Sequence, residues 1–264
     1  MKRKILNLAL LVMIVSPILV LLLWCVTARW PWPAIWPQHF SLRGWEDMTR
    51  QSDRLFKSIF TSMSLSLIVA LLSTTIALLS ARALVLADPF LRRLIRVSLA
   101  LPFIVPVMIF ATGIHQKMIE WGLANKLSGI ILVHLVYSLP YCAYLIFDAY
   151  QAVGIRHEEQ AWLLGAKPYQ AFIKVTLPLL SPVLFTALSM AYIVSFSQYF
   201  LTLMIGGGQV QTLTIWIFPY LQSNDRTLAS NYALLFLGIT LIVLAVFNGI
   251  NYLLKRRYQA IDFY

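Results

Sequence analysis

Charged residues are scarce in this sequence. Asp, Glu, Lys and Arg make up 12% of the 264 residues, whereas 60% are hydrophobic and the mean hydropathy is +0.77. A typical soluble domain has about twice that share of charge. The hydrophobic residues form separate runs of roughly 20, each long enough to cross a hydrocarbon core about 30 Å thick. The composition therefore indicates a membrane protein and excludes an ordinary soluble domain.

Acidic residues are especially few, and the positive charge is dispersed. The formal net charge is +11, but the 21 Lys and Arg residues lie mostly between the apolar runs and form no single basic face. Nucleic-acid binding normally needs such a face. We therefore expect no nucleic-acid partner, and we interpret the charges as orientation signals for a chain in a lipid bilayer.

Patterns for metal, nucleotide and nucleophilic chemistry are also missing. Cys25 and Cys142 lie in or beside separate apolar runs, so they indicate neither a disulfide framework nor a thiolate metal site. No G-x-x-x-x-G-K-[ST] motif occurs among the 11 glycines, so a nucleotide site would have to belong to a partner. His134 and Ser138 have no flanking glycines or oxyanion donor, and no G-x-S-x-G motif is present. We expect no catalytic residue, cofactor or metal in this chain.

Six apolar segments are long enough to cross a bilayer, and none contains Asp, Glu, Lys or Arg. They cover residues 5–26, 59–81, 97–114, 128–147, 179–205 and 227–254. The first has the basic flank of a secretory signal, but it is longer than the usual apolar core of about 7 to 15 residues and lacks a clear cleavage site. We interpret it as a retained span. The expected fold is an all-α membrane protein with six transmembrane helices.

Charge in the short loops gives the expected orientation. Loops 115–127 and 206–226 would share one side of the membrane, and Lys117, Lys126 and Arg226 are their Lys and Arg residues. Because cytoplasmic loops are enriched in Lys and Arg, these two loops are expected outside. Both termini would then face the cytoplasm, in a multi-pass protein of a bacterial inner membrane.

Two parts are expected along the chain. Residues 1–57 would form an N-terminal transmembrane helix with an outer loop, and residues 58–264 would form a five-helix core. The outer loop is rich in Trp and Pro, which suits a segment at headgroup depth, and contact with a delivery protein is the alternative. These residues are Trp30, Pro31, Trp32, Pro33, Trp36, Pro37 and Trp45.

The segment between the fourth and fifth spans is too polar to cross a membrane and has a helical pattern. Glu158 and Glu159 would lie in its first turn, where negative charge offsets the helix dipole. A narrow stripe of small and apolar residues would follow at i, i+3, i+4 and i+7, and would let another protein approach the backbone. The stripe consists of Ala161, Leu164, Gly165 and Pro168.

A second short helix is expected next. Pro168 suits its first turn, and the helix would cover residues 169–174. Ser181 and Pro182 would then cap and begin the fifth span. The whole segment is therefore predicted as helix, turn, helix and membrane span.

This segment resembles a family signature. Binding-protein-dependent importer permeases carry the EAA motif, which reads E-A-A, three residues, G, nine residues, I-x-L-P. The sequence follows its order and spacing at Glu159, Gln160, Ala161, Gly165, Val175, Thr176, Leu177 and Pro178. Gln160 replaces the middle alanine and Val175 replaces the isoleucine, without a change of spacing. The resemblance extends from about Ser58 to the C-terminus, with the first span as an additional helix.

The resemblance implies a type I ABC importer permease fold in which this loop is the coupling helix, seated in a groove of a separate ATPase. Glu159 would contact the ATPase, and Ala161 and Gly165 would permit close docking. The residues implied in coupling are Glu158, Glu159, Ala161, Leu164, Gly165, Leu177 and Pro178. Family members work with two ATPase subunits that bind ATP and magnesium, a second permease subunit in a homodimer or heterodimer, and an extracytoplasmic solute-binding protein.

A weaker resemblance points to the branch that serves polyamines, ferric ion, thiamine and related solutes. It rests on residues 195–200, a glycine run and residues 212–216. The run Gly206, Gly207 and Gly208 would allow positive φ and a close approach to another backbone, either as a flexible turn or as an outer gate or binding-protein contact. Aromatic faces would suit a cationic solute, but nothing in the sequence excludes a neutral or anionic one.

Several residues in the spans are candidates for the wall of a translocation pathway. Pro102 and Pro106, one turn apart, would bend a helix that either lines a cavity or is only tolerated in packing. Ser195, Ser197 and Gln198 would be unfavourable against lipid, so they predict either a pathway wall or interhelical hydrogen bonds. The other candidates are Tyr137, Tyr141 and Tyr199.

A secondary carrier or channel of six helices is the alternative function. A proton-coupled carrier would normally place Asp, Glu or His relays within its spans, and here only His134 qualifies. A solitary histidine of this kind more often takes part in hydrogen-bonded packing. Transport by the purified chain without an ATPase would favour the alternative.

Overall fold

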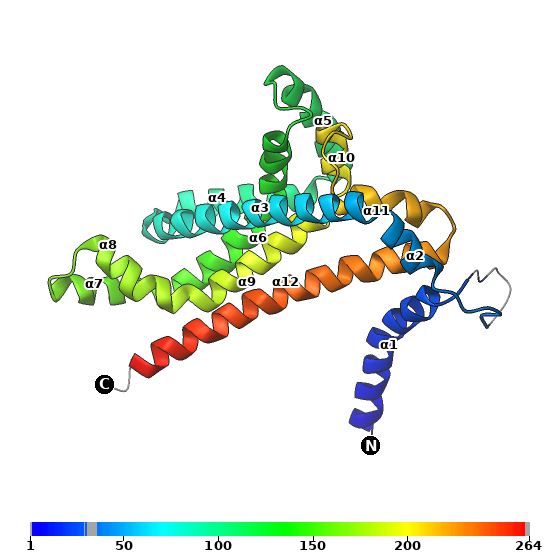
Figure 1. Cartoon of the computed structure of the whole chain (residues 1–264). Coiled ribbons are helices and arrows are strands. Elements are labelled where there is room, and N and C mark those ends of the chain that lie inside the picture. The colour runs from blue at the N-terminus through cyan, green and yellow to red at the C-terminus, as the bar shows by residue number, and fades with distance from the viewer. Residues whose placement is uncertain (1, 29, 31–35, 262–264) are drawn as a thin grey trace. The chain divides into compact units, whose positions relative to one another are not determined.

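The structure of the chain, a computed structural model, describes residues 2–28, 30 and 36–261, and the side chains among them except at 2–5, 8, 9 and 255–261. Its secondary structure in these ranges is helical, apart from one isolated bridge between Thr27 and Phe40. The elements labelled in Figure 1, with the π-helix η1, are α1 (Lys2–Cys25), α2 (Arg43–Arg50), α3 (Ser52–Leu86), α4 (Pro89–Ile104), α5 (Val107–Glu120), α6 (Leu127–Val153), α7 (Arg156–Leu163), α8 (Pro168–Ala171), η1 (Phe172–Thr176), α9 (Leu177–Phe196), α10 (Phe200–Gly206), α11 (Leu213–Gln222) and α12 (Arg226–Ile261). The all-α prediction is confirmed for the described residues.

Four helices of the described chain are long and apolar enough to cross a membrane, and one bent pair raises the number to five. The four are α3, α6, the continuous run Pro168–Phe196, and Arg226–Leu254 within α12. The predicted first span lies in α1, where Leu10–Cys25 is a shorter apolar helix. The predicted apolar runs therefore do form helices, and by length and composition four or five of them qualify as spans.

The predicted third span is wrong as a single helix. Residues 97–114 are divided between α4 and α5, which are bent by 102° relative to each other. Pro106 has no N–H to continue α4, and it restricts Val105 to extended backbone, with φ −80° and ψ 120°. Pro102 lies inside α4 whereas Pro106 is the N-cap of α5, so the two prolines do not share one face of one helix.

The predicted start of the fifth span is also wrong. Pro168 begins α8 as expected, but the helix does not stop after residue 174, because α8, η1 and α9 follow without a break. Pro182 lies inside α9 and does not begin it. Pro178 has no N–H, and its ring would crowd the carbonyl group four residues earlier in a regular helix. The wider π turn just before Pro178 accommodates this, so the chain passes from loop to span as one helix.

The same span ends earlier than predicted. Helix α9 stops at Phe196, and residues 197–199 separate it from the short helix α10. Helix α10 ends at the glycine run, where Gly207 has φ 52° and Gly208 has φ 74°. A Cβ at Gly207 would clash with Oδ1 of Asn125, whose N–H donates to the Ile205 carbonyl at 2.7 Å. The expected positive φ and close backbone approach are confirmed here.

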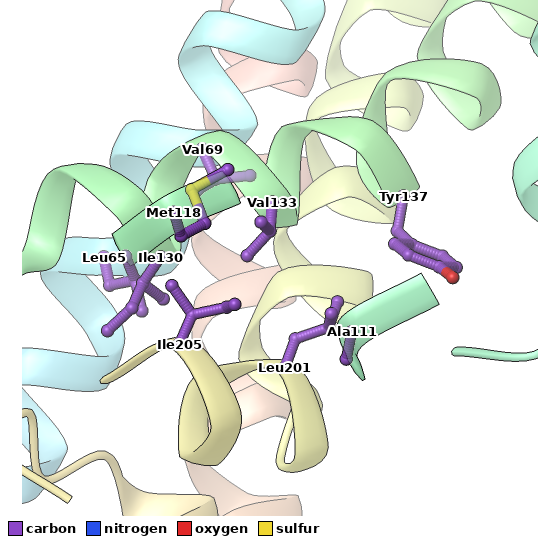
Figure 2. Packing of buried hydrophobic residues seen from close by; sticks show 9 residues of the cluster. All are labelled: Leu65, Val69, Ala111, Met118, Ile130, Val133, Tyr137, Leu201 and Ile205. Carbon is purple, nitrogen blue, oxygen red and sulfur yellow. The ribbon is translucent and has the colours of Figure 1, made fainter. Parts of the chain in front are cut away.

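The described chain divides into two compact units, Met1–Phe60 with Gln211–Ile242 and Thr61–Val210 with Val243–Tyr264. In the second unit, α5 and α10 pack against each other and against α3 and α6 around a buried apolar cluster (Figure 2). The cluster consists of Leu65, Val69, Ala111, Met118, Ile130, Val133, Tyr137, Leu201 and Ile205. Helices α7 and α8 lie at the other end of α6 from this cluster (Figure 1).

In the first unit, a polar network joins α2 to the start of α12. Nη2 of Arg43 donates to both carboxylate oxygens of Asp225, at 2.8 and 2.7 Å. The Tyr232 hydroxyl donates to Asp47 at 3.0 Å. Residues 31–35 of the Trp- and Pro-rich loop lie outside the described residues, so the location of that loop at headgroup depth stays a prediction.

Candidate functional site

The loop between α6 and α9 contains the EAA-like residues, and its first helix ends at a glycine. Helix α7 stops at Leu163, and Gly165 follows with φ +87°. The Gly165 N–H donates to the Trp162 carbonyl at 2.9 Å, and the Ala166 N–H donates to the Ala161 carbonyl at 3.0 Å. These two bonds form a Schellman motif, which satisfies the free carbonyl groups at a helix end.

The predicted helical stripe is therefore wrong beyond the first helix. Ala161 lies in α7, Leu164 is its C-cap, Gly165 lies after the helix end, and Pro168 begins α8. The four residues do not follow one helical face. Glycine after an apolar helical segment, with proline shortly behind, is a stop signal that was present in the sequence.

Large apolar side chains are exposed at the end of α7. The exposed fractions of Leu163 and Leu164 are 87% and 89%, and Trp162 and Glu159 beside them are also exposed. The sequence reasoning included Glu159 and Leu164 but missed Leu163. Adjacent solvent-exposed leucines on a short polar loop, outside the apolar spans, are typical of a surface that another protein covers.

Glu158, which was predicted in the first turn of the helix and among the coupling residues, is buried. Its Oε1 accepts hydrogen bonds from the hydroxyls of Tyr150 and Thr176, both at 2.7 Å, and its Oε2 accepts one from Nη2 of Arg82 at 2.9 Å. Burial acts to raise the pKa of this carboxyl, but the hydrogen bonds from Thr176, Tyr150 and Arg82 and the charge of Arg82 outweigh it. The pKa of Glu158 therefore lies below its ordinary value, and the side chain is an ionised internal link.

Arg82 makes a second contact on the same side. Its guanidinium lies 5.1 Å from the ring centroid of Phe172, which belongs to η1. Farther along, Leu177 and Pro178 line a cavity of about 300 Å³ together with Thr74 and Ser181. The segment that follows the exposed loop therefore contacts α3 at Arg82 and, at the start of the span, encloses a cavity together with α3.

The candidate pathway tyrosines lie beside the bend between α4 and α5. The Tyr137 hydroxyl donates to the Val105 carbonyl at 3.5 Å, and the Tyr137 ring meets Phe110 edge-on at 5.4 Å. Tyr141 meets Phe103 edge-on at 4.8 Å. Tyr141 therefore packs against α4, which contains Pro102, and Tyr137 packs against α5, which Pro106 precedes as N-cap. Their contact with a solute remains a prediction.

A buried hydrogen-bond chain accounts for Ser195 and His134. Nδ1 of His134 lies 2.9 Å from the Ser195 hydroxyl, and Nε2 lies 3.0 Å from the Thr202 hydroxyl. Thr202 donates its own proton to the Gln198 carbonyl at 2.8 Å, so it accepts from Nε2–H, and Nδ1 accepts from Ser195. The packing interpretation of His134 is confirmed, and Ser195 makes an interhelical bond. Thr202 is a member that the sequence reasoning missed.

The remaining candidates lie around the break between α9 and α10. Ser197 is exposed and its hydroxyl donates to the Val194 carbonyl at 3.2 Å. Gln198 and Tyr199 follow it in the break. Ser195, Ser197, Gln198 and Tyr199 therefore lie at or beside one interruption of a helix in the predicted fifth span. Within a membrane, such irregular backbone is tolerated where it is buried in protein or lines a cavity.

Comparison with solved structures shows the fold. The chain is similar over 96% of its length to 96% of a chain in the crystal structure of a bacterial alginate ABC transporter in complex with an alginate pentasaccharide-bound periplasmic protein, with a TM-score of 0.67 and 14% identity. At this identity the similarity shows a shared fold. This chain therefore shares its fold with a chain of an ABC transporter structure.

Sequence comparison gives the family. Residues 73–260 match the binding-protein-dependent transport system inner membrane component, and the chain belongs to this family. It is 27% identical over 205 residues to a probable sulfate transport system permease of Nephroselmis olivacea, covering 72% of each chain. It is 26% identical over 207 residues to a spermidine/putrescine transport system permease homologue of Mycoplasma genitalium, covering 77% of this chain and 72% of that protein.

Proposed function

We propose that this inner membrane component is a six-span permease subunit whose α7 loop is the coupling helix for a separate ATPase. The observation that carries the proposal is the exposed apolar end of α7, at Leu163 and Leu164, inside a loop that follows the EAA signature. Such a surface suits a groove on a soluble partner. The sixth span would be α1, and the bent α4–α5 pair would count as one.

The partners follow from the same proposal. Two ATPase subunits would bind ATP and magnesium, because no phosphate-binding loop motif occurs in this sequence. A second permease, either another copy of this chain or a different one, would complete the pathway, and an extracytoplasmic protein would deliver the solute. Both termini would face the cytoplasm of a bacterial inner membrane.

The solute is proposed only as a small molecule supplied by the binding protein. A polyamine, ferric ion or thiamine-like solute fits the weaker resemblance at residues 195–216. One relative is named for sulfate and another for spermidine and putrescine, so proteins of similar identity to this chain serve solutes of opposite charge. The binding protein encoded beside this chain would identify the solute through its pocket.

Co-purification with the cognate ATPase tests the coupling surface. In the double variant Leu163→Ser, Leu164→Ser, membrane levels should stay normal, because both residues lie outside the apolar spans. Association with the ATPase should fall about tenfold or more, since uncovering one leucine costs roughly 1.5 to 3 kcal/mol and 1.4 kcal/mol corresponds to a factor of ten. Leu42→Ser, at another exposed leucine far from the loop in sequence, is the matched control.

Two results would contradict the proposal. Full ATPase association of the double variant would show that α7 is not the docking surface. Solute transport by the purified chain without any ATPase would favour the carrier or channel alternative. Neither result is expected for a subunit that depends on a partner for nucleotide binding.

A further inference from the structure

Helix α7 is joined to the chain through two glycines. Gly154 precedes it with φ +71°, and Gly165 follows it with φ +87°. No atom lies within 4 Å of the position of a Cβ at either glycine, so neither junction is held by packing around that position. Side-chain packing at these two positions therefore does not fix the orientation of α7, and both junctions depend on backbone conformations that glycine adopts readily.

Glu158 supplies the fixed connection. In the described part of the chain, it is the α7 residue whose side chain hydrogen-bonds to other helices, and its partners come from three of them. Arg82 lies on α3, Tyr150 on α6, and Thr176 in η1 directly before α9. Tyr150 and Thr176 are buried, as is Glu158 itself. One carboxylate thus joins the exposed loop to α3, α6 and η1.

This arrangement favours motion of the four elements together. A buried carboxylate that loses one partner keeps its charge without compensation, which is strongly unfavourable. A displacement of α7 that left α3, α6 and η1 in place would have to break these bonds. If the three helices move with α7, all of the Glu158 hydrogen bonds are kept, and Arg82 also remains over the Phe172 ring.

We propose that Glu158 is the positioning residue that transmits displacement of α7 to α3, α6 and α9, and that it does not itself contact the ATPase. The proposal rests on the proposed function, since it assumes that an ATPase displaces α7. It assigns separate roles to two adjacent glutamates. The exposed Glu159 belongs to the docking surface, and the buried Glu158 belongs to the internal connection.

The test measures transmission without knowledge of the solute. The complex with the cognate ATPase is prepared with Cys25 and Cys142 replaced and with Ser181→Cys as a reporter in the wall of the α9 cavity. The maleimide labelling rate of the reporter is measured with and without ATP plus vanadate. With Glu158 intact, trapping the ATPase should change the rate by about fivefold or more, the lower end of typical coupling between sites.

Glu158→Gln keeps the size of the side chain but removes the charge that pairs with Arg82. We expect normal ATPase co-purification and loss of the nucleotide-dependent change in labelling. Arg82→Gln should give the same loss, the double variant should be no worse than either single one, and Arg82→Lys should restore part of the response. Glu159→Gln, the same chemical change one residue away, should instead weaken ATPase association while the complexes that form still respond to nucleotide.

The outcomes separate the two proposals. If the intact chain neither binds the ATPase nor responds to nucleotide, the proposed function and this inference both fail. If the intact chain responds and Glu158→Gln and Arg82→Gln respond equally well, only the inference fails. If Glu158→Gln and Arg82→Gln abolish ATPase association, Glu158 serves assembly and the inference is likewise wrong.

Discussion

Gly165 has a backbone conformation that few other residues adopt. The space around its Cβ position is open, so a substitution there costs conformational energy within this chain and does not overfill a packed site. A non-glycine residue in the left-handed region costs about 1 to 2 kcal/mol, and asparagine tolerates it best. We expect Gly165→Leu to reach the membrane normally but to lose ATPase association, and Gly165→Asn to lose much less.

The comparison of these two variants at equal membrane levels decides the role of Gly165. Equal association of both with the ATPase would show that the Schellman turn does not position α7. Lys167→Leu, beside the turn, should have a much milder effect than Gly165→Leu and serves as the control for added apolar volume.

The ionised state of Glu158 gives a pH prediction. Because its native pKa is lowered, the carboxylate stabilises the fold fully above the pKa of an unfolded glutamate, about 4.3, and loses this contribution as pH falls through the native pKa. Wild type should therefore unfold at a higher temperature than Glu158→Gln by a constant margin from neutral pH to about pH 5. The margin should shrink in more acidic buffer. A margin that grows on acidification would contradict a lowered pKa.

For individual residues, the sequence did not show which side chains would be buried. Glu158 and Glu159 are identical in type and adjacent, and both suit the first turn of a helix. Only the fold reveals that one meets Arg82, 76 positions earlier in the chain, while the other faces outward. At Gly165, by contrast, the sequence did contain the helix stop signal. The prediction was wrong there because it continued the helical stripe beyond this glycine.

At the scale of the helices, the bend between α4 and α5 can be tested by a distance measurement. Spin labels at the exposed residues Leu94 and Ile119 would lie about 37 Å apart on one straight helix, at 1.5 Å per residue. With the observed bend of 102° the same two arms place them roughly 23 Å apart. We expect the shorter distance in lipid nanodiscs, by double electron–electron resonance.

Pro106→Ala should keep most of this bend. The proline explains where the helix stops, but the buried residues Ala111 and Met118 hold α5 against its neighbours. A distance near that of the straight helix, in the wild type or the variant, would show that packing does not maintain the bend.

Helix existence was predictable from the apolar runs, and helix interruption was not. The run 97–114 stays hydrophobic on both sides of its break, so hydropathy gives no sign of that break. Pro106 was a visible signal, whereas the break at 197–199 has no proline and was marked only by polar residues that suit several interpretations. The His134–Ser195–Thr202 chain could not be assembled from sequence, because its members come from three different helices.

At the scale of the whole molecule, orientation is the prediction that the fold does not test. Single cysteines at His157 and Gln222, in a background without Cys25 and Cys142, should label from opposite sides. The charge distribution predicts that position 222 lies outside, so it should react with an impermeant maleimide in intact cells. Reaction of position 157 under the same conditions would overturn the predicted topology.

The π turn η1 has a consequence for single-residue deletions in the segment that leads into α9. The nine residues between Gly165 and Val175 include the first three residues of the wide turn that leads into α9. Removing one residue from η1 would let a regular α-helix form there, because a π turn holds one residue more than an α turn. Each residue of an α-helix turns the chain by about 100° and advances it by about 1.5 Å. Four residues of an α turn and five residues of a π turn cover nearly the same angle, so this deletion should leave the direction of the exposed leucines of α7 nearly unchanged. Deleting one residue from a regular turn of α9 would instead rotate them by roughly a quarter turn about the axis of the span. The direction of the loop therefore depends on where a residue is lost, and a chain altered by a single deletion in α9 would present its loop in the wrong direction even with every side chain of the loop retained.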